Sequence, residues 1–197
     1  MRLLLYVVVL SLTMGCQPVL QRLLDTPPAP QNLTLTSEML TAPVMRVDIP
    51  SRNARAQLSR VAVNKDVETW MAVDNISLSF RQGVLVASRG LGFDLMGADA
   101  QGTLNAFSGQ GEEVYRRQMR YLSGDNHSTY LMAGCRMKTI GIEVIDTQRL
   151  QRLEETCKAR QNDFTNIFWL NETGDIVQFK QWLSPETGYI KGSIAQN

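Results

Sequence analysis

The sequence predicts an all-β protein, an antiparallel β-sandwich or open barrel-like meander, behind an N-terminal signal peptide and an extended tether. Two observations support this fold class. Apolar and polar residues alternate in short segments, as at residues 76–80, which is the pattern of a strand with one buried face. Turn signals recur roughly every eight to twelve residues, and such regular spacing is typical of antiparallel sheets.

Residues 1–15 have the features of a lipoprotein signal peptide. Arg2 supplies a positive charge, residues 3–12 form an apolar run too short to span a bilayer core of about 30 Å, and Gly15 precedes Cys16. This pattern predicts export, cleavage before Cys16 and lipid attachment to its thiol. The alternative is an ordinary cleaved signal peptide with an incidental cysteine. The residue that follows the lipidated cysteine influences the membrane to which a lipoprotein is sorted. An aspartate there would favour retention in the inner membrane, whereas Gln17 indicates the periplasmic face of the outer membrane.

The mature chain is expected to consist of a tether and one domain. Residues 16–43 include Pro18 and Pro27, Pro28 and Pro30, and proline-rich segments stay extended. Residues 44–197 suit a single β-rich domain with a substantial core. Loss of Arg2 leaves 19 basic and 19 acidic residues, so the mature protein is formally neutral. A nucleic-acid-binding protein should be distinctly basic, which argues against that class of partner.

The expected strands are separated by turn signals. Gln82-Gly83 places glycine where a hairpin needs a positive φ, and Asn171-Glu172-Thr173-Gly174 is a second hairpin signal. Residues 148–160 fit either a helix or a further strand. The expected strands are residues 44–49, 58–63, 67–73, 76–80, 84–87, 114–122, 130–135, 139–145, 164–170 and 176–183.

Two cysteines, Cys135 and Cys157, remain once Cys16 is assigned to lipid. Two cysteines in an oxidising compartment most often form a disulfide. The loop between them is about 20 residues, and closing it is worth about 3 kcal/mol in a chain-entropy treatment. The alternative is a metal site, but the sequence has one histidine, His127, and no close cysteine pair. We therefore predict a disulfide, and no metal or cofactor.

No segment carries a complete catalytic pattern. His127 lies in an expected turn, and no serine lies in a GxSxG elbow. Residues 90–95 start like a dinucleotide-binding loop but lack its third glycine and a surrounding βαβ unit, so a glycine-relieved bend is the simpler interpretation. Adjacent acids such as Glu154 and Glu155 point to opposite faces of a strand, although carboxylates from distant strands could still form a glycosidase site. We expect no catalytic residues, with a glycan-modifying enzyme as the alternative.

Aromatic and basic side chains are candidates for a glycan or partner surface. The three tryptophans could stack on sugar rings, although burial in the core is the commoner fate of such side chains. Three arginines of the expected strand 114–122, Arg117 among them, could meet an acidic glycan, although a solvated strand face is the simpler interpretation. The candidate surface residues are Trp70, Arg116, Arg120 and Trp182.

Several segments, in order, resemble a known family. They are Trp70 with Gly83-Val84-Leu85 and Gly90-Leu91-Gly92-Phe93-Asp94-Leu95, then Glu155-Thr156-Cys157, then Asn166-Ile167-Phe168-Trp169 with Gly174-Asp175-Ile176-Val177, and finally Gln181-Trp182-Leu183-Ser184-Pro185 with Gly188-Tyr189. Behind a lipobox, they resemble the YjbF/GfcB family of group 4 capsule and exopolysaccharide lipoproteins. Lys180 and Arg89 depart from the residues usual in that family.

This resemblance implies an antiparallel β protein without known catalytic residues that takes part in making or exporting a surface polysaccharide. Its partners would be the membrane, through the lipid anchor, other polysaccharide-export proteins of the envelope, and the polysaccharide itself. We therefore expect a non-enzymatic, membrane-anchored accessory protein of capsule or exopolysaccharide export. An envelope assembly factor that binds lipid or protein is a further alternative, and it would need an apolar groove or patch.

Overall fold

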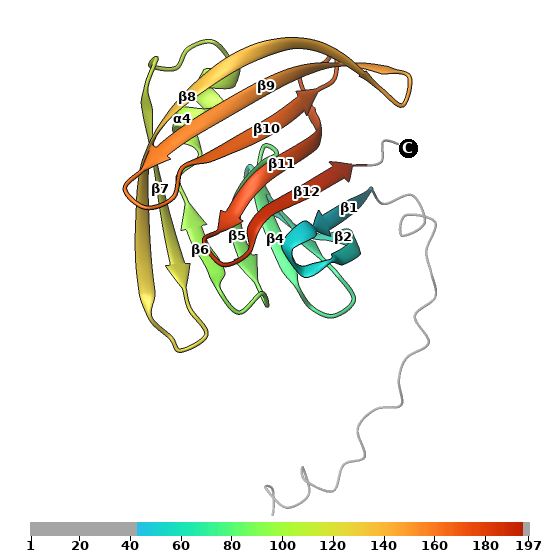
Figure 1. Ribbon diagram of the computed structural model, residues 1–197. Helices are drawn as coiled ribbons and strands as arrows, with labels where there is room; N and C mark the ends of the chain where they lie inside the picture. The colour runs from blue at the N-terminus through green and yellow to red at the C-terminus, as the bar shows by residue number, and fades with distance from the viewer. Residues whose placement is uncertain (1–42, 195–197) are drawn as a thin grey trace, which may run out of the picture. The chain divides into compact units, whose positions relative to one another are not determined.

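Twelve antiparallel strands form one sheet in the computed structural model, which describes residues 43–194. The sheet curls into a barrel-like shape (Figure 1), with β5 and β6 as its two ends. Neighbouring strands follow chain order, except that the first strand, β1, pairs with the last, β12. The strands are β1 Val44–Ile49, β2 Ala54–Asn64, β3 Val67–Met71, β4 Ser77–Arg81, β5 Val84–Arg89, β6 Asp94–Ala98, β7 Tyr115–Leu122, β8 Ser128–Ile145, β9 Gln148–Ala159, β10 Phe164–Leu170, β11 Ile176–Ser184 and β12 Gly188–Ile194.

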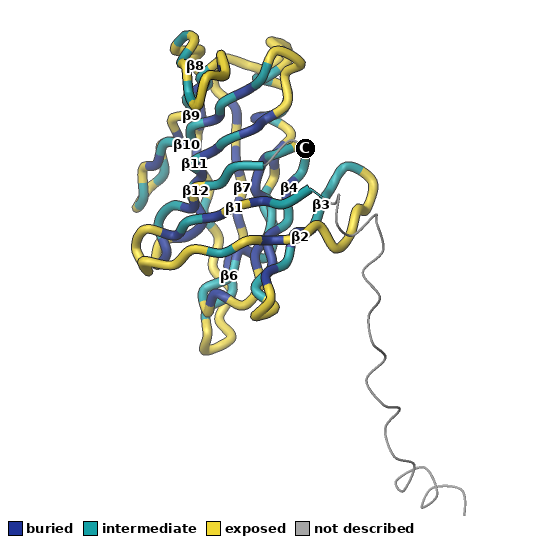
Figure 2. Tube along the Cα trace, turned by 90° about the vertical axis from the view of Figure 1, so that its right-hand side faces the viewer, coloured by how far each residue is buried: buried dark blue, intermediate teal, exposed yellow. Residues whose placement is uncertain are grey.

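The barrel interior is the hydrophobic core, and the period-two alternation of the strands fills it (Figure 2). In β10, for example, Phe164, Asn166, Phe168 and Leu170 are buried, while Thr165, Ile167 and Trp169, which alternate with them, are partly exposed. A short helix, α4 (Gln101–Phe107), packs at one end, where the Phe107 ring meets the Phe168 ring edge-on with centroids 5.0 Å apart. No helix within residues 43–194 has the length and apolar character needed to cross a membrane.

Side chains close the seam between β5 and β6, the two strands that lack a ladder with each other. The Ser88 hydroxyl donates to the Asp94 carboxylate (2.9 Å) and accepts from the backbone N–H of Leu95 (2.9 Å). The same carboxylate accepts hydrogen bonds from the backbone N–H groups of Gly90 and Leu91. The chain bends here with a positive φ at Gly90, a conformation that glycine adopts without strain. The predicted glycine-relieved bend is therefore confirmed, and it completes the barrel.

Hydrogen bonds also join segments that are far apart in the sequence. The buried Gln181 amide of β11 accepts from Leu85 N–H and donates to the Gly83 carbonyl, both at 2.8 Å, at the β4–β5 hairpin. At the other end of the barrel, the 3-10 turn η1 (Pro50–Arg52) places Arg52 where its guanidinium donates to the Leu91 carbonyl at 2.8 Å. Both ends of the molecule are therefore tied across the interior.

Most predicted strands are confirmed, with differences that have physical causes. The two expected strands at 130–135 and 139–145 are a single strand, β8, because a bulge between Thr139 and Gly141 absorbs one extra residue. The ambiguous segment at 148–160 is a strand, β9, held between β8 and β10. Four elements were not predicted: η1, β6, α4 and β12. Of the two predicted architectures, a β-sandwich and an open barrel-like meander, the structure has the barrel-like one.

The predicted disulfide between Cys135 and Cys157 is present. The two residues lie directly opposite each other in the β8–β9 ladder, and neither side chain is exposed. This bond links two strands on the inner side of the barrel wall. The signal peptide (1–15), the lipid-modified Cys16 and nearly all of the tether lie outside the described residues and stay predictions.

Removing the disulfide should destabilise the fold. The double variant Cys135→Ala/Cys157→Ala is expected to lose about 2–4 kcal/mol of unfolding free energy, because its unfolded chain regains the entropy of the open loop. Urea unfolding measures this loss. Dithiothreitol should lower the stability of the wild type by a similar amount and leave the double variant unchanged. A double variant as stable as the oxidised wild type would contradict this expectation.

Candidate functional site

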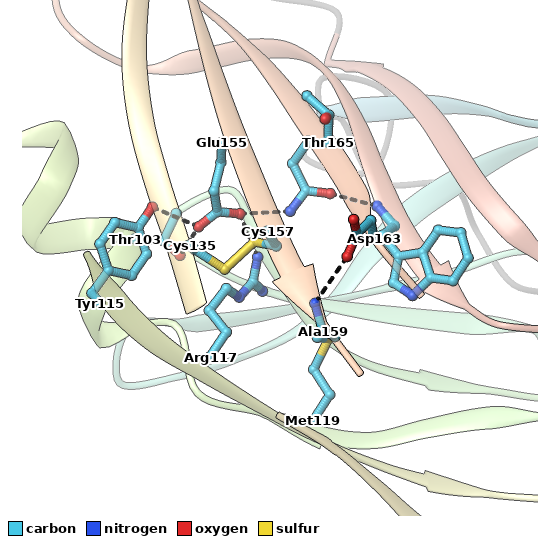
Figure 3. Close-up of a disulfide and its surroundings, with 12 residues drawn as sticks. Thr103, Tyr115, Arg117, Met119, Cys135, Glu155, Cys157, Ala159, Asp163 and Thr165 are labelled. Carbon is cyan, nitrogen blue, oxygen red and sulfur yellow. Dashed lines mark hydrogen bonds and ion pairs between the residues drawn. A yellow bond between two sulfur atoms is a disulfide. The ribbon is translucent and has the colours of Figure 1, made fainter. Parts of the chain in front are cut away.

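A buried carboxylate, Glu155 of β9, forms the most concentrated polar cluster of the described residues. One carboxylate oxygen accepts from the hydroxyls of Thr103 (2.5 Å) and Tyr115 (2.8 Å). The other accepts from the Arg117 guanidinium (2.7 Å) and the Asn166 amide (2.6 Å). Figure 3 shows Glu155 beside the disulfide, with Tyr115 and Arg117 directed towards it. Four donors from α4, β7 and β10 thus surround a carboxylate with no exposed surface.

The strand alternation explains why these polar side chains point inwards. Arg117 is in phase with Tyr115 and Met119, which are buried on the same face of β7. Its interpretation as part of a solvated strand face is therefore wrong, since only 3% of its surface is exposed. Sequence reasoning also missed Glu155 as an interior residue, although it is in phase with the buried Cys157. The two-residue alternation of each strand places Arg117 and Glu155 on the interior face, but their charge led sequence reasoning to treat them as exposed.

Electrostatics favour an ionised Glu155. Burial has the largest single effect and raises its pKa, but the Arg117 guanidinium and three hydrogen bonds together hold the pKa below its usual range. Burial, together with the Glu155 charge, raises the pKa of Tyr115 and keeps that hydroxyl protonated as a donor. A carboxylate that is ionised, enclosed and engaged by four donors is unsuited to general acid or base chemistry on a substrate.

The same cluster has the spacing of a metal site. Ligand atoms of Cys135, Cys157 and Glu155 lie within 4.8 Å of one another. Metal ligation by cysteine requires thiolates, whereas these two sulfur atoms are bonded to each other. The donors around Glu155 occupy its oxygens as well. While the disulfide is intact, these residues form a structural cluster. Cys135 and Cys157 then offer no thiolate, so they do not form the metal site that the sequence left as an alternative.

The predicted surface residues do not share one surface. Trp70 has 1% of its surface exposed and belongs to the core, which removes it from the candidate set. Trp182 is partly buried, and its ring stacks on Phe164 with centroids 5.6 Å apart. Arg116 and Arg120 are exposed on the outer face of β7. His127, as expected, lies in an exposed turn, where it pairs with Asp125 at 2.9 Å.

Two of the hollows formed by the described residues are candidates for a binding site. The first, called the wall groove here, has a volume of about 700 Å³ and lies on the outer wall formed by strands β2, β1, β12, β11 and β10. The second, called the mouth cavity, has a volume of about 830 Å³ and lies at the end of the barrel that carries α4 and the β2–β3, β4–β5 and β10–β11 turns. Trp70, Phe80 and Phe179 border the mouth cavity from the core side, each with no more than 2% of its surface exposed. Both volumes are in the range of ligand-binding sites.

Carboxylates do occur in the mouth cavity. Asp66 and Glu68 line it, and each pairs with an arginine: Asp66 with Arg81 at 2.5 Å and Glu68 with Arg60 at 2.7 Å. The hydrogen bond from Arg81 holds the pKa of Asp66 below its usual range. A general acid for glycoside hydrolysis needs a raised pKa instead, so this pair favours a structural role for Asp66.

The buried ion pair generates a stability prediction. Glu155→Gln should cost about 3–5 kcal/mol of unfolding free energy, because it leaves the Arg117 charge buried without a counter-charge. The neighbouring Glu154 faces solvent with Arg152, so Glu154→Gln should cost less than about 1 kcal/mol. Denaturant unfolding at neutral pH compares the two variants. Equal losses would contradict the structural role of the buried pair.

The pH dependence follows from the lowered pKa of Glu155. Its folded-state pKa lies below the unfolded value of about 4.3, so its contribution to stability is present above that pH and is lost as the pH falls through the folded pKa. The wild type should therefore lose stability more steeply in acid than Glu155→Gln does. Unfolding curves measured at a series of pH values below about 5 test this difference.

Comparison with known proteins agrees with the fold and identifies the family. The crystal structure of the hypothetical lipoprotein YmcC from Escherichia coli (K12) superimposes with a TM-score of 0.67, covering 79% of this chain and 84% of that chain at 17% sequence identity. At this identity the likeness shows the fold. No curated protein sequence matches the chain. The family model for the group 4 capsule polysaccharide lipoprotein gfcB, YjbF matches residues 20–193. Because this match spans nearly the whole chain, the protein belongs to the YjbF family of group 4 capsule polysaccharide lipoproteins.

Proposed function

We propose that this protein is a non-enzymatic, lipid-anchored accessory protein that assists the export of a capsule or exopolysaccharide. The family match over residues 20–193 is the observation that carries the proposal, because it spans nearly the whole described domain and much of the tether. The partners in this role are other polysaccharide-export proteins of the envelope.

The interior of the barrel supports a role without catalysis. Its centre is filled by the hydrophobic core and by the closed cluster around Glu155. Each oxygen of that carboxylate already accepts two hydrogen bonds, so a substrate would have to displace core contacts to reach it. Surfaces on the outside of the barrel are then the places where a polymer or a protein partner would be bound.

The anchor determines where this activity takes place. Lipid on Cys16 would hold the protein at the periplasmic face of the outer membrane, and Gln17 favours that membrane. The β1 strand starts at Val44, so 27 residues separate Cys16 from the barrel. Such a proline-containing segment gives the domain reach while it stays attached.

The mouth cavity favours a second candidate function, an envelope assembly factor that binds lipid or protein. Its floor includes Trp70 and Phe80, and Val63 on its rim is 60% exposed. On the long strand β8, Ile142 and Val144 are also exposed, at 55% and 68%. Binding of a fluorescent fatty acid that is lost in Val63→Glu would favour this candidate, and absence of binding would remove it.

Deletion of the gene in the native host tests the main proposal. The deletion strain should make less surface-bound polysaccharide, because export lacks an accessory protein. Complementation with the wild type should restore the amount, whereas Cys16→Ala should not, since the chain would lack the lipid that holds it at the outer membrane. Quantified cell-bound and secreted polysaccharide provides the measurement, with immunoblots to show that both forms are exported in equal amounts.

Unchanged polysaccharide in the deletion strain, under conditions where the parent strain clearly makes it, would contradict the export role. Full restoration by Cys16→Ala would leave the export role in place and remove the requirement for the anchor.

A further inference from the structure

The wall groove carries two parallel rows of outward-facing residues, which the sheet register aligns across neighbouring strands. The first row runs through Lys180 of β11, Lys191 of β12, Asp48 of β1 and Arg55 of β2, each directly opposite the next. Adjacent strands are about 4.8 Å apart, so this row spans roughly 14 Å. Figure 2 faces this wall, where β11, β12, β1 and β2 lie side by side.

The first row has an excess of positive charge. Lys180 and Lys191 form a directly opposed like-charge pair, an arrangement that destabilises a sheet. Asp48 is the single acidic side chain lining the groove, against four basic ones. None of the four basic side chains lies within ion-pair distance of a carboxylate in residues 43–194. The basic side chains are Arg46, Arg55, Lys180 and Lys191.

The second row has the chemistry of a sugar-binding surface. It runs through Trp169 of β10, Gln178 of β11, Ser193 of β12, Arg46 of β1 and Gln57 of β2. Amide and hydroxyl groups can pair with sugar hydroxyls, and a guanidinium can grip a carboxylate with two hydrogen bonds. At the end of the row the indole N–H of Trp169 donates to Glu143 at 2.7 Å, which fixes the ring at the edge of the groove.

We infer that the wall groove binds a segment of an acidic polysaccharide, with carboxylates of the sugar chain over the Lys180–Lys191 pair and sugar rings along the polar row. This inference rests on the proposed function and names the class of polymer. Bound carboxylates would relieve the repulsion between the two lysines, since the row has only one carboxylate, Asp48, against three cations. Positive charge concentrated in a concave surface also raises the local concentration of an anionic chain.

The groove differs from the other surfaces that could take an anion. On β7, Arg116 and Arg120 lie on a face that also carries Met132 and Tyr130, exposed at 51% and 63%. A surface that binds an anionic membrane usually adds apolar side chains to its basic ones. The large exposed apolar residues of the described domain lie outside the residues lining the wall groove, so its chemistry favours a hydrated, charged sugar chain over a lipid surface.

Isothermal titration calorimetry of the full chain in a non-ionic detergent tests the inference, with oligogalacturonate as the acidic probe and a maltooligosaccharide of equal length as the neutral one. We expect oligogalacturonate to bind at least tenfold more tightly than the neutral chain, and added salt to weaken its binding. Lys180→Glu/Lys191→Glu should weaken it at least tenfold, because the charge of the row is reversed. The matched control Arg116→Glu/Arg120→Glu makes the same charge change on β7 and should alter affinity less than twofold.

The folded state of the variants is checked separately. Lys180→Gln/Lys191→Gln removes the like-charge pair but also the contact of the Lys180 ammonium with the Tyr189 ring (4.3 Å to the centroid), so its melting temperature should stay close to that of the wild type while its affinity for oligogalacturonate falls. Equal binding of the two oligosaccharides, or loss of binding only in the β7 variant, would overturn the inference. The wild type could instead bind anionic phospholipid vesicles and not oligogalacturonate, with vesicle binding abolished in Lys180→Glu/Lys191→Glu. That result would overturn the inference and identify the wall groove as a membrane-binding surface. These results leave the deletion phenotype untouched, so the inference and the proposed function fail separately.

Discussion

Arg117 and Glu155 place opposite charges in the interior of the barrel, where burial raises the free energy of a charge. Side chains from other elements of the barrel reduce this cost by donating hydrogen bonds to Glu155. A buried ion pair is stable only when its remaining donors and acceptors are satisfied. Thr103 of α4, Tyr115 of β7 and Asn166 of β10 meet that need at Glu155, whereas the buried Nε of Arg117 has no hydrogen-bond partner among the described residues. The Asn166 side chain then accepts from the backbone N–H of Trp182 at 2.6 Å, so the network extends to β11. The helix α4 and the strands β7, β9 and β10 must therefore come together before the Glu155 carboxylate has its four donors, and Asn166 connects this cluster to β11.

The alternating pattern made most strands predictable, but closure of the sheet has no comparable local signal. The pairing of β1 with β12 joins residues near the two ends of the described domain, and the β5–β6 seam depends on the side chain of Asp94. The strand β12 was missed because Gly188–Ile194 contains two glycines and few apolar residues, so its pairing with β1 and β11 decides its conformation. The interior charges of Arg117 and Glu155 were missed for a different reason. Their charge predicts exposure to solvent, whereas their position in the strand alternation predicts burial, and sequence reasoning followed the charge.

The segments that resemble the family contribute to the fold more than to an exposed site. Asp94 closes the β5–β6 seam, Glu155 and Asn166 belong to the buried cluster, and Gln181 bonds to Gly83 and Leu85. The wall groove, by contrast, takes Arg46, Arg55 and Lys191 from outside those segments. Its basic character arises only when β11, β12, β1 and β2 are brought into register. Sequence reasoning therefore selected arginines of one strand, Arg116 and Arg120, because residues aligned across several strands could not be seen without the register.

Surface-bound polysaccharide in the deletion strain complemented with wall-groove variants tests most directly whether this protein acts by binding a polymer on its outer wall. The account predicts that Lys180→Glu/Lys191→Glu, exported and folded at the wild-type level, restores little polysaccharide, and that Arg116→Glu/Arg120→Glu restores the wild-type amount. Equal restoration by the two variants would contradict the account and would move attention from the wall groove to the mouth cavity.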